Sequence, residues 1–228
     1  MGANVLDDSP IESGFLSQSL NKAQQKVEER AYEQRKNLFE YDEVLNQQRN
    51  IVYRERRIFL MRNSVQSIVL AYGEQFVTNI VNQLKAQKIT LNYIHKLYET
   101  FFSYKISLNY AEEDNFDPDN YSFIELHNYF FQEFWLAYQS RLDQFAIYGN
   151  GLEIFKNLEK QIILNCINIS WKEQLQKASL LREAVRWRSY GQKNPLTEYR
   201  IEAYKEFKNC EQAIIYTTVY LVFNFMIV

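Results

Sequence analysis

The sequence predicts an all-α protein with one very long helix, a group of shorter helices and an antiparallel helical hairpin. Three observations lead to this fold class. Residues 15–61 contain neither proline nor glycine, apolar residues recur at three- and four-residue steps along much of the chain, and the 228 residues include only 3 Pro and 6 Gly. A helical rhythm of apolar side chains without helix-breaking residues is typical of long helices.

The first predicted element is a single helix over residues 15–61. About 45 helical residues span about 70 Å, far more than an ordinary globular helix, and such a length suits a backbone that joins domains. One face of this helix mixes charges of both signs, which leaves two interpretations open: a solvated face or a docking surface for other domains. The other face is apolar and consists of Leu20, Ala23, Val27, Ala31, Leu38, Tyr41, Leu45 and Val52.

The middle of the chain predicts shorter helices over residues 65–84, 91–102 and 121–148. The acidic stretch at residues 112–119 is interpreted as a solvated loop, because its spacing is not that of a calcium-binding EF-hand loop. Residues 121–148 are unusually rich in aromatic side chains, and we interpret them as part of a hydrophobic core rather than as the wall of a ligand groove.

From residue 152 onward the chain predicts two helices joined by a short basic turn, which together form an antiparallel hairpin. Asn194 suits the N-cap of the second helix, and Pro195 suits its first position. Tyr190 lies in the turn, where its ring either contacts another polymer or packs against its own hairpin. The facing apolar stripes are predicted at Leu175, Ala178, Leu181 and Val185, and at Leu196, Tyr199, Ala203, Phe207, Cys210 and Ile214.

The last sixteen residues, 213–228, are nearly all apolar. They fall short of the roughly 20 residues that cross a bilayer. We therefore do not interpret them as a membrane span.

Composition excludes several function classes. The net charge of −2 lacks the basic excess of a dedicated nucleic-acid binder, so no nucleic-acid partner is expected. Cys166 and Cys210 are far apart and predict buried, reduced thiols instead of a disulfide framework or a zinc site. His95 and His127 are isolated and offer no metal or catalytic spacing. No G-x-x-x-x-G-K-[ST] phosphate loop is present, so we expect neither a bound cofactor nor catalytic residues in this chain.

Two motifs resemble the SecA family, the motor ATPases of the Sec preprotein translocase. Residues 171–199, which end in RSYGQKNPLTEY, resemble the two-helix finger of that family. Residues 23–49, which end in NLFEYDEVLNQQR, resemble the long helix of its helical scaffold domain. In the middle of the chain, residues 63–150 match only by position, where the family carries a helical wing domain. Two departures are Gln174, where a His is usual, and Trp187, where a Leu is usual.

The resemblance implies three parts and a function. Residues 1–62 would form a lead-in and the long scaffold helix, residues 63–150 the inserted wing domain, and residues 151–228 the finger and a closing scaffold helix. The apolar end of the chain, residues 213–228, resembles the end of the scaffold region in this family, which implies a helix that packs on the long first helix. The whole would belong to a motor that couples ATP hydrolysis to the movement of unfolded preproteins through a SecY-type channel. ATP and Mg would bind to the nucleotide-binding domains of the full-length family, outside this chain.

The resemblance also implies two groups of site residues. The finger end would contact substrate and channel, and positive charge around Tyr190 would orient it toward acidic channel loops or lipid headgroups at the membrane surface. The residues expected there are Tyr190, Arg186, Arg188, Gln192 and Lys193. The residues expected to dock the nucleotide-binding domains are Arg30, Arg35, Tyr41, Asp42, Gln48 and Arg49.

The source and extent of the chain lead to further expectations. Many Tyr, Phe, Asn and Ile residues are typical of an AT-biased genome and favour an organellar gene, hence the plastid stroma and thylakoid membrane as the location. The alternative is bacterial cytoplasm and inner membrane. Residues 1–5 do not resemble the SecA family, whereas residues 8–12 do. This difference favours the interpretation that the chain is a truncated fragment of a motor protein. The alternative is a free-standing helical interaction module that binds or regulates the translocase.

The missing phosphate loop predicts that the purified chain neither binds nor hydrolyses ATP. Isothermal titration calorimetry with Mg-ATP should give no saturable heat. Saturable binding in the micromolar range would contradict the prediction.

Overall fold

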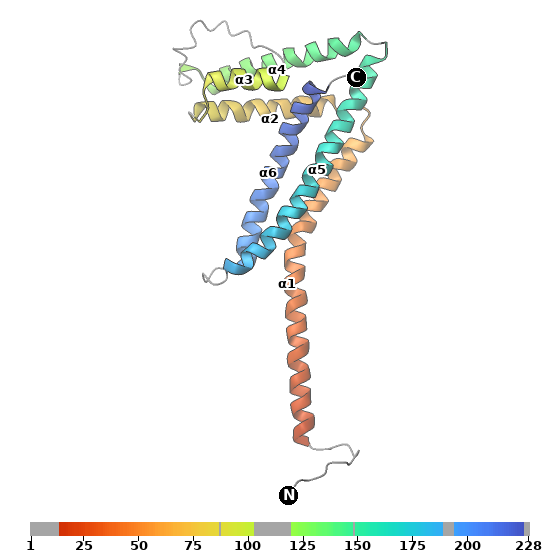
Figure 1. Cartoon of the computed structure of the whole chain (residues 1–228), viewed down its shortest axis with the longest axis vertical. Helices are drawn as coiled ribbons and strands as arrows, with labels where there is room; N and C mark the ends of the chain where they lie inside the picture. The colour runs from red at the N-terminus through yellow and green to blue at the C-terminus, as the bar shows by residue number, and fades with distance from the viewer. Residues whose placement is uncertain (1–13, 87, 103–119, 148, 189–193, 226–228) are drawn as a thin grey trace. The chain divides into compact units, whose positions relative to one another are not determined.

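The computed structural model describes residues 14–86, 88–102, 120–147, 149–188 and 194–225. Within these ranges the regular elements are α-helices and no strand occurs, which confirms the predicted all-α fold (Figure 1). The helices are α1 (Gly14–Met61), α2 (Gln66–Lys85), α3 (Leu91–Phe102), α4 (Phe123–Ala146), α5 (Gly151–Arg188) and α6 (Pro195–Asn224).

α1 runs without interruption over 48 residues, as predicted. The chain divides into two compact units between Asn46 and Gln47, so α1 contributes its first part to one unit and its last part to the other. In the first unit the predicted apolar face is exposed at Leu20, Val27 and Leu38. In the second unit Val52 on the same face is buried. The apolar periodicity thus identified a face that this chain covers only in its last part.

α2, α3 and α4 enclose a core of aromatic side chains, which confirms the interpretation of this region. The Tyr98 hydroxyl donates a hydrogen bond of 2.9 Å to the carbonyl oxygen of Phe130, so the polar end of this buried ring is satisfied. The ring centroid of Phe102 lies 4.9 Å from that of Tyr98 and 5.6 Å from that of Phe134, both in edge-to-face geometry. Such ring pairs contribute about 0.5–1.5 kcal/mol each beyond the burial of their area.

A glycine allows α2 and α4 to approach each other closely. Gly73 on α2 lies directly under the ring of Phe134 on α4, and a Cβ atom built at Gly73 would lie 2.1 Å from Phe134 Cζ. No side chain fits at position 73 while this ring stays in place. Gly73 therefore serves packing, although glycine in a helix interior costs about 1 kcal/mol relative to alanine.

The apolar end of α6 packs against α2, α3 and α4, which corrects the predicted partner, the long first helix. The ring centroid of Phe223 lies 4.5 Å from that of Phe102, and the centroid of Tyr216 lies 5.2 Å from that of Phe76. The aromatic core of the three shorter helices needs a further apolar helix to exclude water, and the end of α6 supplies it. In the described part of the chain, no helix is both long and apolar enough to cross a membrane.

A buried carboxyl group joins α4 to α5. Glu159 on α5 is 1% exposed, and the Tyr138 hydroxyl on α4 donates a hydrogen bond of 2.7 Å to its Oε1. Its Oε2 has no hydrogen-bond partner among the described residues. Burial raises the pKa of Glu159 to about 7, although the hydrogen bond from Tyr138 and the charge of Lys156 act in the opposite direction. The carboxyl group therefore titrates near neutral pH.

We predict that this carboxyl group makes stability depend on pH. The pKa of Glu159 rises from 4.5 to about 7 on folding. The contribution of this group to the free energy of unfolding is therefore fully present below about pH 4.5 and is lost as the pH rises through about 7. In wild type the free energy of unfolding should decrease as the pH rises from 5 to 8. In Glu159→Gln this decrease should be smaller by up to about 3 kcal/mol, as measured by urea unfolding at several pH values. The control is Glu173→Gln, which changes an exposed carboxylate on the same helix. Parallel pH profiles for wild type and Glu159→Gln would contradict the prediction.

Candidate functional site

The candidate site is the hairpin of α5 and α6 together with the last part of α1, which packs on it. The end of α5 and the start of α6 lie side by side, as the predicted hairpin requires (Figure 1). Ala178 and Val185 on α5 and Tyr199 and Ala203 on α6 are buried, so the two stripes largely agree with the prediction. Leu175 is exposed, however, because the neighbouring residue takes the buried position.

The second hairpin helix begins where the sequence predicts. The Asn194 side chain accepts hydrogen bonds from the backbone N–H groups of Leu196 and Thr197, at 3.0 and 3.4 Å. Pro195 occupies the first helical turn, where its missing N–H group costs nothing. An N-cap of this kind contributes about 1 kcal/mol and fixes the residue at which α6 starts.

A buried amide pair connects α1 to both hairpin helices. The Gln174 side chain on α5 donates through Nε2 to Oε1 of Gln48 on α1, at 3.3 Å. Gln48 in turn donates through Nε2 to the carbonyl oxygen of Ala203 on α6, at 3.1 Å. Gln48 is 6% exposed and Gln174 is 1% exposed, so these hydrogen bonds form away from water. Breaking one of them would leave a buried polar group without a partner, which costs about 1–3 kcal/mol.

This pair changes the role expected for Gln48, which the sequence analysis placed on a docking surface. Gln48 follows Leu45 by three residues and precedes Val52 by four, so it lies on the apolar face of α1 and turns inward. Gln174 stands where the SecA family usually has a His, and the sequence indicated no role for it beyond this departure. It follows the buried Trp171 by three residues and precedes the buried Ala178 by four, a spacing that indicates the buried stripe of α5.

Further contacts hold the last turns of α1 against α5. The Lys160 ammonium group donates to the carbonyl oxygens of Leu60 and Arg62, at 2.8 and 3.0 Å. A cation at the carboxyl end of a helix also interacts favourably with the helix dipole. The Arg56 Nε atom donates to Oδ1 of Asn168 at 3.2 Å. These bonds fix the end of α1 on the first hairpin helix.

The other predicted docking residues remain on the surface of α1. Arg30, Arg35 and Asp42 are exposed and Tyr41 is half-buried, all within the first compact unit. Arg49 is exposed within the second unit. Their role as a docking surface stays a prediction.

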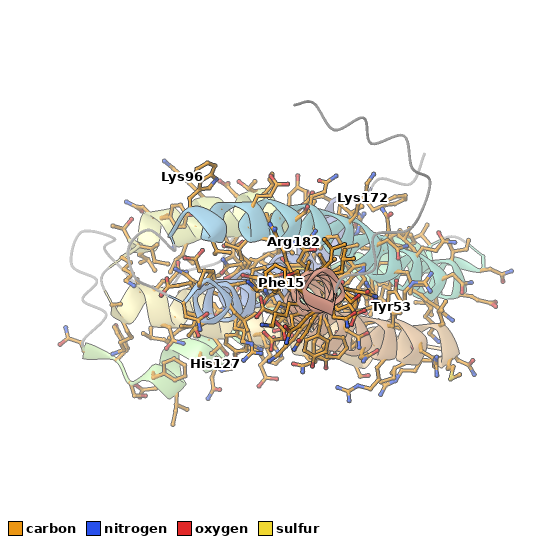
Figure 2. All side chains as sticks on the ribbon, turned by 90° about the horizontal axis from the view of Figure 1, so that it is seen from below. Phe15, Tyr53, Lys96, His127, Lys172 and Arg182 are labelled. Atoms are coloured by element: carbon orange, nitrogen blue, oxygen red, sulfur yellow. The ribbon has the colours of Figure 1, made fainter. Side chains whose placement is uncertain are left out.

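The predicted contact residues of the hairpin end lie outside the described residues. Tyr190, Gln192 and Lys193 are not described, and Arg186 and Arg188 are described only through the backbone of α5. Other cationic side chains on α5 are described, including Lys172 and Arg182 (Figure 2). Trp187, the next-to-last residue of α5, is 73% exposed and presents a large ring at the surface, next in sequence to the predicted contact residues Arg186 and Arg188.

The described residues offer no metal site. They contain no group of three or more His, Cys, Asp or Glu side chains that could hold a metal ion. Cys166 and Cys210 are both buried and free, as predicted. Burial raises the pKa of Cys210 to about 11, so its thiol stays protonated at neutral pH and is a poor nucleophile. His127 lies within hydrogen-bonding distance of the Thr78 hydroxyl and stacks on Phe131, which is a packing role.

These features define an all-helical scaffold in which a long helix, a hairpin and an aromatic-cored helical group share one core. The sequence model of the SecA Wing and Scaffold domain matches residues 10–226. The chain therefore belongs to this family.

Similar proteins come from plastid-bearing algae and are called protein translocase subunit SecA. The one from Phaeodactylum tricornutum is 48% identical over 220 residues, which cover 96% of this chain and 25% of that protein. The protein from Thalassiosira pseudonana is 47% identical over 92% of this chain and 23% of its own length. The protein from Antithamnion sp. is 35% identical over 96% of this chain and 24% of its own length. The chain thus spans about a quarter of the length of these curated relatives.

We predict that two tryptophans of α5 differ sharply in their effect on stability. Trp171 is 7% exposed and packs edge-on against Tyr53 at 6.5 Å between ring centroids. Trp171→Ala should therefore lower the free energy of unfolding by about 3–5 kcal/mol through the cavity that it leaves. Trp187→Ala should change it by no more than about 0.5 kcal/mol, because the ring is exposed. Urea denaturation followed by circular dichroism measures both, and similar losses would contradict this assignment.

Proposed function

We propose that this chain is the part of a SecA-type translocase motor that transmits movement to a substrate-contacting hairpin. ATP and Mg would act at nucleotide-binding domains outside this chain. α1 would carry the resulting displacement, and the end of the α5–α6 hairpin would contact the unfolded preprotein at the mouth of a SecY-type channel. The names of the relatives support the translocase part of this proposal.

The observation that carries the proposal is the buried joint between α1 and the hairpin. Gln48 is hydrogen-bonded to both α5 and α6 at the same place, so α1 cannot slide or rotate there without breaking buried hydrogen bonds. The bonds from Lys160 to the last carbonyl groups of α1 resist the same movement. A displacement of α1 would therefore move the hairpin with it rather than dissipate at a loose contact.

The surface of α1 supplies candidates for docking to the absent domains. Arg30, Arg35, Asp42 and Arg49 are exposed there, and Gln48 is left out because it is buried. Exposed apolar positions on the same helix, such as Leu20 and Val27, would become buried if other domains packed on it.

The relatives and the proposed partner support a location. Because the relatives come from plastid-bearing algae, we place this protein in the plastid stroma, with peripheral contact at the thylakoid membrane. The SecY-type channel is the partner that would bring it to that membrane.

The test targets the hairpin end in an intact translocase that carries this segment. Tyr190→Ala should reduce preprotein transport at least about tenfold and leave the melting temperature unchanged, because a turn residue contributes little to stability. Tyr190→Phe should retain most transport, since the ring remains available for stacking and burial.

The matched control is Tyr204→Ala, which removes an exposed ring from the body of α6. It should leave both transport and melting temperature unchanged. If Tyr190→Ala transports normally, or if Phe is as damaging as Ala, the proposed contact is wrong.

A further inference from the structure

A pocket lies between the last part of α1 and the middle of α5. It has a volume of about 380 Å³ and is lined by Tyr53, Arg56, Arg57, Leu60, Asn168 and Trp171. This volume is near the lower end of the range of ligand pockets, about 300–1,000 Å³, and suits one or two side chains. The pocket is separate from the end of the hairpin and from the predicted docking residues 30–49.

The lining of the pocket is cationic. Arg56 and Arg57 both contribute to it, and none of its lining residues carries a carboxylate. The Arg56 guanidinium group is oriented by its bond to Asn168, which leaves further N–H groups on the same fork. Arg57 is exposed. The nearest carboxylate in sequence, Glu55, is repelled by Glu211 on α6 and attracted by Arg54 and Lys208, none of which lines the pocket.

Apart from Asn168, the remaining lining consists of two aromatic rings and one aliphatic side chain. The Trp171 ring is held edge-on against Tyr53, and Leu60 completes the apolar side. Tyr53, labelled in Figure 2, is 53% exposed, so part of its ring is accessible to a ligand. Tryptophan, tyrosine and arginine are the residues that most often dominate protein–protein binding energy.

We propose that this pocket binds an acidic peptide segment of a protein partner, in which an apolar side chain stands next to a carboxylate. The carboxylate pairs with the guanidinium groups of Arg56 and Arg57, a geometry that arginine supports with two parallel hydrogen bonds. The neighbouring apolar side chain packs against Leu60 and the accessible ring of Tyr53. This site adds to the proposed function a second contact, away from the end of the hairpin.

Other occupants fit the pocket less well. Trp171 is only 7% exposed and presents no open face on which a nucleic-acid base can stack. The overall net charge of −2 also disfavours nucleic acid. A lipid acyl chain needs a longer apolar channel than Leu60 and two aromatic rings provide.

The test uses the complete 228-residue chain and two synthetic peptides. One is acetyl-Leu-Asp-Asp-Phe-amide, and the other is its uncharged counterpart acetyl-Leu-Asn-Asn-Phe-amide. The indole N–H resonances of Trp135, Trp171 and Trp187 are followed by NMR and assigned with Trp135→Phe and Trp187→Phe. The acidic peptide should shift the Trp171 resonance saturably and leave the other two in place. The uncharged peptide should bind at least about tenfold more weakly, because the charge-assisted hydrogen bonds are lost.

Two variants test the charge requirement. Arg57→Gln should weaken binding of the acidic peptide about tenfold, and the matched control Arg54→Gln, an exposed arginine of α1 outside the pocket, should not. Both side chains are exposed, so unchanged indole resonances in the free variants confirm folding. Equal effects of the two variants, or equal affinity for the two peptides, overturn the proposal.

Two further measurements separate the alternative occupants. Phosphatidylglycerol vesicles that shift the Trp171 resonance when the acidic peptide does not would make the pocket a lipid site and overturn the proposal. A Trp171 shift that depends on protein concentration alone would identify a second copy of the chain as the occupant, with the same consequence.

Discussion

The second compact unit depends on one constraint, which is that α6 buries one face along its whole length. The first half of that face lies against α5, and the second half lies against the aromatic side chains of α2, α3 and α4. Because a single helix serves both contacts, the hairpin and the shorter helices form one core instead of two independent ones. The buried residues that form this face are Tyr199, Ala203, Phe207, Cys210, Ile214, Thr218, Val219, Val222 and Phe223.

Buried polar groups then select one arrangement of helices around that core. Apolar packing tolerates small sliding movements, whereas the Gln48–Gln174 and Tyr138–Glu159 hydrogen bonds form at one register only. Glu159 joins α5 to α4, and Gln48 joins α1 to α5 and α6. These buried hydrogen bonds therefore help to define how the last part of α1, the hairpin and the shorter helices fit together.

Much of the helical layout could be predicted from the sequence, because local signals determine it. The absence of proline and glycine between residues 15 and 61 gave the extent of α1, and Asn194 with Pro195 gave the start of α6. The predicted bounds 91–102 coincide with α3. These signals act within a few residues, so no knowledge of tertiary contacts is needed to interpret them.

The contacts between helices were less accessible from the sequence. Periodicity shows that a face is buried but does not identify the helix that covers it, which is why the apolar end of α6 was assigned to the wrong partner. A resemblance carries roles by position, and it therefore placed Gln48 on a surface although its spacing from Leu45 and Val52 turns it inward. The predicted contact residues of the hairpin end, Tyr190 among them, fall outside the described residues and stay predictions.

The contact between Gly73 and Phe134 also limits how this fold can change over evolutionary time. Position 73 holds no side chain as long as a phenyl ring occupies position 134. A lineage that acquires alanine or serine at 73 must first or simultaneously replace the phenylalanine by a smaller residue, and it then has to fill the space that the ring leaves. The two positions are far apart in the chain, yet they should vary as a pair across related sequences. The identity of one residue then constrains the amino acids that selection accepts at the other.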